Sequence, residues 1–86
     1  MELWFTSTFK KAYKKLPISI QEQTQEALVL FESNPSHPSL GFKKMKGTRD
    51  IWELRITQSY RLTLKRDGNI TIVRYIGTHD ILRKEG

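Results

Sequence analysis

The sequence predicts an α+β fold of order βααβββ, with a helical hairpin packed on one face of a small antiparallel sheet. Two observations support this prediction. Apolar residues recur at helical spacing through residues 7–33, and from about residue 50 they recur at every second position. Because 86 residues suffice for one modest core, we expect residues 1–86 to form a single domain.

The N-terminal segment predicts a strand followed by a helix. In "MELWFT", Leu3 and Phe5 alternate with Glu2 and Trp4, as is typical of a strand. Residues 7–17 then carry one apolar stripe at helical spacing, which Ser7 or Thr8 would cap and Pro17 would end. The stripe consists of Phe9, Ala12, Tyr13 and Leu16.

A second helix follows directly. Ser19 and Glu22 have the spacing of a capping box, which predicts its start. Pro35 and Pro38 in "SNPSHPS" end it and predict a surface loop. Since very few residues separate the two helices, we expect a hairpin. The predicted buried face of the second helix comprises Ile20, Thr24, Ala27, Leu28 and Phe31.

Three strands are predicted in the second half, in "DIWELRIT", "SYRLTLK" and "NITIVRYIG". Asp67 and Gly68 favour a tight hairpin turn, so the strands should form an antiparallel meander. The alternation assigns to the core face Trp52, Leu54, Ile56, Leu62, Leu64, Ile70 and Ile72. It assigns to an open, water-facing side Glu53, Arg55, Arg61, Lys65, Val73, Tyr75 and, beyond Gly77, His79.

Arg74 does not fit this alternation, because it falls among the isoleucines predicted to be in the core. A β-bulge or a frayed strand end near Arg74 would explain the misfit and would also re-aim Tyr75.

Composition excludes several classes of site. The chain has no cysteine, so disulfides and thiolate zinc sites are excluded, and a reducing cytoplasm suits it. The two histidines, His37 and His79, are a poor basis for a metal site. No segment has the pattern of a membrane span or a signal peptide. We therefore expect no metal, no cofactor and no membrane partner.

Charge is distributed unevenly. The formal net charge is +6, and it lies wholly in residues 41–86, since residues 1–40 carry four lysines and four glutamates. A basic half of this kind favours an anionic partner, most commonly a phosphate backbone. The alternative is a solvated basic surface that keeps a small protein soluble.

The order of elements, the segment "KKMKG…RDIWELRI…YRLTLK" and the closing "GTHDIL" resemble the RelE/ParE superfamily of bacterial toxins from toxin–antitoxin pairs. The closing motif is most similar to the YafQ-like branch. The resemblance covers nearly the whole chain and implies the RelE-like microbial RNase-type fold. It further implies a type II toxin that an antitoxin holds inactive and that cleaves mRNA in the ribosomal decoding site, without metal or cofactor.

The resemblance also implies roles for individual residues. His79, in Gly-Thr-His, stands where YafQ-like enzymes keep a catalytic histidine, and Arg61 stands where RelE-like enzymes carry a functional arginine. Arg55 lies near one of their basic residues on the sheet, and Tyr75 stands where many relatives have arginine. The second histidine and the Asp-Trp pair of the YafQ branch have no counterpart in residues 58–60.

These roles agree with the chemistry of RNA cleavage. RNA supplies its own nucleophile, the 2′-hydroxyl, so the enzyme needs proton transfer and cations for the charge on phosphorus. His79 suits proton transfer, Arg55 and Arg61 suit phosphate, and Tyr75 suits base stacking. Further cations that we expect to contact mRNA or the 16S and 23S rRNA surfaces are Lys43, Lys44, Lys46, Lys65 and Arg74.

Two other functions remain open. A ParE-like toxin that inhibits DNA gyrase would need no catalytic histidine. A degenerate toxin would retain only the ability to bind its antitoxin, and the missing catalytic residues favour this reading.

Overall fold

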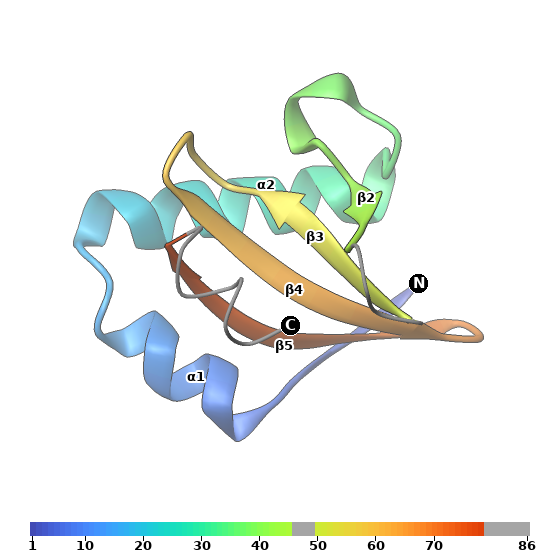
Figure 1. Ribbon diagram of the computed structural model, residues 1–86, viewed down its shortest axis with the longest axis horizontal. Helices are drawn as coiled ribbons and strands as arrows, with labels where there is room; N and C mark the ends of the chain where they lie inside the picture. The colour runs from blue at the N-terminus through green and yellow to red at the C-terminus, as the bar shows by residue number, and fades with distance from the viewer. Residues whose placement is uncertain (46–49, 79–86) are drawn as a thin grey trace.

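The computed structural model describes residues 1–45 and 50–78 (Figure 1). Within these ranges the chain forms two α-helices, one short 3₁₀-helix and one five-stranded sheet. None of the helices described is both long and apolar enough to cross a membrane. The elements are β1 (Glu2–Phe5), α1 (Ser7–Lys14), α2 (Ile18–Ser33), η1 (Pro38–Leu40), β2 (Lys43–Lys44), β3 (Ile51–Arg55), β4 (Tyr60–Asp67) and β5 (Ile70–Thr78).

The sheet has the strand order β1-β5-β4-β3-β2. Strands β3, β4 and β5 form the predicted antiparallel meander, and the α+β fold class is confirmed. β1 returns beside β5 and pairs with it in parallel, so the sheet is mixed. β2 was not expected from the alternation, because two residues are too few to show a period.

Both helices lie on the same face of the sheet, and in Figure 1 α2 runs behind β3 and β4. The helical periodicity is confirmed, since the predicted face of α2 is the one turned to the core. The buried core consists of Phe9, Ala27, Leu28, Phe31, Leu40, Leu54, Leu62, Leu64, Val73 and Ile76. The other face of the sheet is therefore the one left for function.

The predicted helix starts were wrong by one or two residues. Thr6, not Ser7 or Thr8, caps α1, and its hydroxyl accepts a hydrogen bond from the amide of Phe9 at 3.0 Å. α2 begins at Ile18 with Pro17 in the cap position and no side-chain cap. Because the Pro17 carbonyl accepts the first helical bonds, Ser19 lies inside the first turn and the predicted capping box does not form.

Of the two explanations for Arg74, the β-bulge is confirmed and the frayed strand end is not, since β5 stays paired with β4 on both sides of Arg74. Thr63 pairs with Tyr75 while Leu64 pairs with Val73, so Arg74 is an extra residue on β5. The bulge shifts the alternation by one position and sets Tyr75 on the open face.

The predicted facing of residues 70–73 was therefore wrong. Val73, expected on the open face, has 0% exposure in the core, and Thr71 is buried beside it. Ile70 and Ile72, expected in the core, are half-buried on the opposite face. The predicted alternation of faces is correct at Tyr75 and Ile76 but is reversed for residues 70–73, on the other side of the bulge.

Candidate functional site

The candidate site is built around two arginines on neighbouring strands. Arg55 ends β3, Arg61 is the second residue of β4, and the two form a directly opposed cross-strand pair. Since their neighbours Leu54 and Leu62 are buried in the core, both arginine side chains leave the sheet on the face away from the helices, and that of Arg55 also lines a pocket with residues of α2. They line a pocket of about 320 Å³ together with Ile56, Thr57 and Gln58. Like charges placed directly opposite lower the stability of a sheet, whereas an anion between them would be held from both sides.

Arg61 is fixed by the turn between β3 and β4. Its Nη1 donates hydrogen bonds to the carbonyl oxygens of Thr57, Gln58 (2.9 Å) and Tyr60 (3.2 Å). Thr57 also stabilises the turn, because its hydroxyl accepts from the amides of Ser59 and Tyr60. The Arg61 side chain is only 18% exposed, so its guanidinium is held in place at the pocket wall.

Arg55 is held on the other side of the pocket. Its Nε and Nη2 donate to the carbonyl oxygen of Ser39, and Nη2 also donates to that of Pro38, each at 3.4 Å. Backbone carbonyls thus face both guanidinium groups and offset part of their mutual repulsion.

Glu53 was predicted to lie on a water-facing surface, and this prediction was wrong. It is only 6% exposed and lies between two cations, 3.7 Å from Arg61 Nε and 3.7 Å from Lys43 Nζ. Its cross-strand neighbour Thr63 is 0% exposed, and within the described part of the chain the Thr63 hydroxyl has no hydrogen-bond partner. The middle of the expected open face is therefore buried, and Glu53 is neutralised there by two cations rather than solvated.

Tyr75 lies on the same face as the arginines. It pairs with Thr63, one row along the sheet from the pair formed by Arg61 and Gly77, and it is half-buried. The structure thus brings together Arg55, Arg61 and Tyr75. His79 lies outside the described residues, so its expected place beside them stays a prediction.

The other predicted RNA-binding cations are dispersed. Lys65 is exposed on the same face but four residues from Arg61, about 13 Å along β4. Lys43 is exposed and paired with Glu53, whereas Lys44 pairs with Trp52 and faces the helix side of the sheet. Arg74 is the half-buried bulge residue. Lys46 lies outside the described residues.

Thr57 and Gln58 belong to the site but were not predicted. They follow the last alternating residue of β3 and act through the turn they form and through their carbonyl groups. A threonine two positions before a serine, just where the strand period ends, is a signal for a side-chain-capped turn. The contacts made by the backbone carbonyl groups cannot be predicted from the residue types, because every residue has a carbonyl group.

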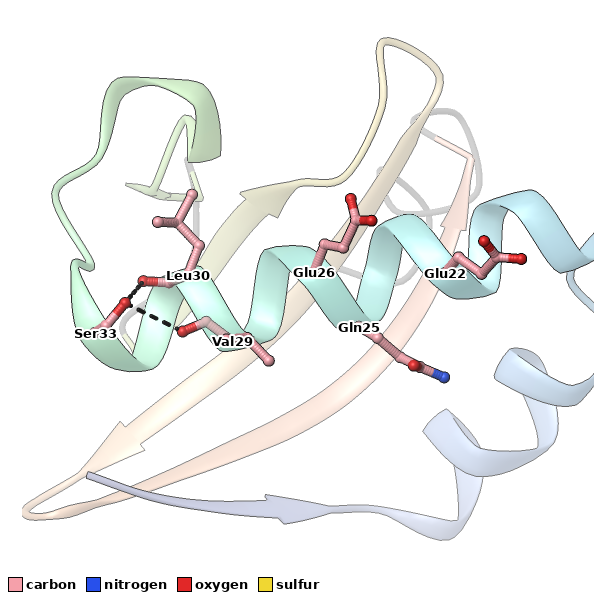
Figure 2. A pocket seen from close by; sticks show the side chains of 6 residues that line it. All are labelled: Glu22, Gln25, Glu26, Val29, Leu30 and Ser33. Carbon is pink, nitrogen blue, oxygen red and sulfur yellow. Dashed lines mark hydrogen bonds between the residues drawn. The ribbon is translucent and has the colours of Figure 1, made fainter.

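A different kind of pocket, of about 540 Å³, lies along the outer surface of α2 (Figure 2). Its lining includes the carboxylates Glu22 and Glu26, which project from the helix, and the exposed Val29. Ser33 closes one end, where its hydroxyl donates to the carbonyls of Val29 and Leu30. An acidic lining repels phosphate, so the arginine pocket is the better nucleic-acid site.

We expect Glu53→Gln to strengthen RNA binding by about threefold to tenfold, since the lost carboxylate competes with phosphate for Arg61. The free energy of unfolding should fall by about 1–3 kcal/mol, because the nearly buried Arg61 would lose its charge partner, whereas the ion pair to exposed Lys43 is weak. Fluorescence anisotropy with a labelled single-stranded RNA and a thermal melt measure the two effects. Glu22→Gln on α2 makes the same change away from the arginines, in a pocket that neither arginine lines, and should leave both unchanged. Weaker RNA binding by Glu53→Gln would mean that Glu53 holds Arg61 in its binding position.

Comparison with known proteins identifies the family and the fold. Residues 18–80 match the family model of the ParE-like toxin domain. No curated protein sequence matches the chain. A chain of the RelB–RelE antitoxin–toxin complex from Methanococcus jannaschii is 22% identical, with a TM-score of 0.77 over 95% of this chain and 96% of that one.

Two E. coli structures have the same fold. YafQ from strain BL21(DE3) is 13% identical, with a TM-score of 0.79 over 94% of this chain and 96% of its own. A chain of the intact RelBE toxin–antitoxin complex is 24% identical, with a TM-score of 0.71 over 90% of this chain and 94% of that one. The chain thus shares the fold of these toxin structures. The chain belongs to the ParE-like toxin domain family, within the RelE/ParE superfamily of toxin–antitoxin systems.

Proposed function

We propose that this protein is the toxin of a type II toxin–antitoxin pair and an endoribonuclease that cleaves mRNA on the ribosome. The observation that supports this most strongly is the opposed pair Arg55 and Arg61, which line one pocket at the turn between β3 and β4. Two guanidinium groups on one pocket match a phosphodiester that gains negative charge during cleavage.

In the proposed reaction the RNA 2′-hydroxyl attacks the adjacent phosphorus, and the 5′-oxygen of the next nucleotide leaves. Arg55 and Arg61 stabilise the charge on the phosphate oxygens, and His79 transfers the proton to or from the reacting oxygens. Tyr75, on the same face, stacks against a base or supports the phosphate. The RNA provides the nucleophile, so the proposed reaction is independent of metal.

The ribosome is proposed to orient the RNA. With a single histidine proposed for proton transfer, the protein alone would be a modest catalyst, and a surface that positions the message would raise the rate. Lys43, Lys44 and Lys46, at or beside β2, are proposed to contact rRNA phosphates.

An antitoxin is the proposed protein partner. The RelE chains from M. jannaschii and E. coli were crystallised in complexes with RelB. A basic half with a charge of +6 favours an acidic wrapping segment, which would cover the arginines and block RNA.

Controlled expression in bacteria tests the proposal. Induction of the wild-type protein should stop growth and leave cut messages, and His79→Ala should restore growth and leave messages intact. His37→Asn is the matched control, because it removes the other histidine. Equal toxicity of His79→Ala and the wild type would remove His79 from the reaction. A wild-type protein without any growth defect would instead indicate a degenerate toxin that only binds antitoxin.

A second candidate function is inhibition of DNA gyrase, which is favoured by the match to a ParE-like family model. The basic face would then bind protein or DNA and would need no acid or base. A supercoiling assay with purified gyrase distinguishes the two functions, because inhibition there with intact messages would favour this second function.

A further inference from the structure

We propose that residues 37–41, the Arg55 turn, act as a positioning element for the Arg55 guanidinium. The Arg55 turn consists of η1 with its caps His37 and Gly41. This inference rests on the proposed function, since it concerns how one of the two arginines is set for phosphate. It gives a role to His37 and to the proline-rich loop, which the proposed reaction does not use.

The turn binds one edge of the guanidinium. The carbonyl oxygens of Pro38 and Ser39 accept from Nε and Nη2 of Arg55, at distances of 3.4 Å. Within residues 1–45 and 50–78, Nη1 has no hydrogen-bond partner. The turn therefore anchors one edge of the planar group, and the Nη1 amino group is the one assigned to a phosphate oxygen.

Gly41 brings the turn against the stem of Arg55. Its φ of 52° is in the left-handed region, where residues with a side chain are strained. A Cβ at this position would lie 3.4 Å from Arg55 Cβ and 3.6 Å from Cζ and Nε. The Gly41 amide also donates to the Pro38 carbonyl at 3.3 Å, which fixes one of the acceptors that Arg55 uses.

His37 closes the other end of the turn. Its Nδ1 accepts from the Ser39 amide at 3.2 Å and lies 2.8 Å from the Ser39 hydroxyl. The Ser39 carbonyl is the one that receives both Nε and Nη2 of Arg55. His37 therefore acts on Arg55 through Ser39 and is a positioning residue, not a catalytic one.

A positioning element is needed because the Arg55 guanidinium has two pockets within reach. Arg55 and Ile56 line the pocket shared with Arg61 and also an adjacent pocket of about 200 Å³ that contains Glu26. Repulsion from Arg61 and attraction to Glu26 would both draw the guanidinium toward that adjacent pocket. The Arg55 turn opposes this, and a guanidinium ordered beforehand loses less rotamer entropy when phosphate binds.

NMR relaxation of the Arg55 ¹⁵Nε tests the positioning itself, without RNA. In the wild type we expect an order parameter near that of rigid backbone, about 0.85, and in His37→Ala a value below about 0.6. His37→Asn should restore the order, because asparagine is a good cap and keeps a side-chain acceptor. Unchanged Arg55 order in His37→Ala, with the fold intact, would overturn the inference. So would failure of His37→Asn to restore it.

RNA affinity tests whether the positioning serves phosphate binding. By fluorescence anisotropy with a short labelled single-stranded RNA, His37→Ala should bind about threefold to tenfold more weakly than the wild type. The same substitution in an Arg55→Ala background should have no further effect on RNA affinity, because His37 acts on RNA binding only through the Arg55 guanidinium. An equal loss in both backgrounds would contradict the inference. Loss of Arg55 order without loss of RNA affinity would support the positioning and count against the proposed RNA site.

Discussion

Replacing Arg61 by alanine is expected to lower mRNA cleavage about 10²–10³-fold, the size typical for removing one group that stabilises transition-state charge. Arg61 is fixed by three turn carbonyls and by Glu53, so its cation is already in place before RNA arrives. Arg61→Lys should recover only part of the rate, because an ammonium cannot reproduce the planar fork. Single-turnover cleavage on programmed ribosomes measures the effect.

Lys65→Ala is the matched control for Arg61→Ala. It removes a cation from the same strand and the same face, about 13 Å away, and its side chain is exposed. It should weaken binding slightly and leave the cleavage rate of bound RNA unchanged. A comparable loss of rate in both variants would mean that overall charge, rather than the arginine pair, supports cleavage.

Phe31→Ala is expected to lower the free energy of unfolding by about 3–5 kcal/mol, the largest stability effect that we predict. Phe31 has 0% exposure, and its ring meets that of Phe42 edge-on at 5.1 Å, while Phe42 stacks on Trp52. The substitution would leave a cavity between α2 and the sheet. For a domain of this size, the melting temperature should fall by at least about 12 °C.

Val29→Ala is the control on the same helix. Val29 is 67% exposed, so the change should alter the free energy of unfolding by about 0.5 kcal/mol or less. Equal melting temperatures of Phe31→Ala and the wild type would show that α2 does not pack on the sheet as described here.

The fold could be predicted because its periodicities are strong. Leu54, Leu62 and Leu64 alternate with polar residues, and Ala27, Leu28 and Phe31 recur at helical spacing, so both patterns identify the buried faces directly. An irregularity at Arg74, either a bulge or a frayed strand end, could also be predicted, because Arg74 interrupts the alternation. The sequence could not predict on which side of the bulge the expected alternation would hold, because threonine and isoleucine both suit either face of a strand. Pairing with Leu64 rather than residue type places Val73 in the core.

The candidate site could be predicted only in part. Arg55 and Arg61 were expected on one face from their strand positions, and their cross-strand register brings them directly opposite. Glu53 forms ion pairs with two cations, Lys43 from β2 and Arg61 from β4, which meet only in the folded sheet. The carbonyls of Pro38 and Ser39 are backbone groups, so their role depends on loop geometry that no residue pattern encodes.

The most direct test of the central claim uses the purified wild-type protein with ribosomes programmed with a defined message. If the pocket lined by Arg55 and Arg61 cleaves RNA, the message should be cut within the codon in the decoding site and should be left with a 2′,3′-cyclic phosphate. The same RNA without ribosomes should stay largely intact. An uncut message on the ribosome, at protein concentrations that stop growth in cells, would contradict the account.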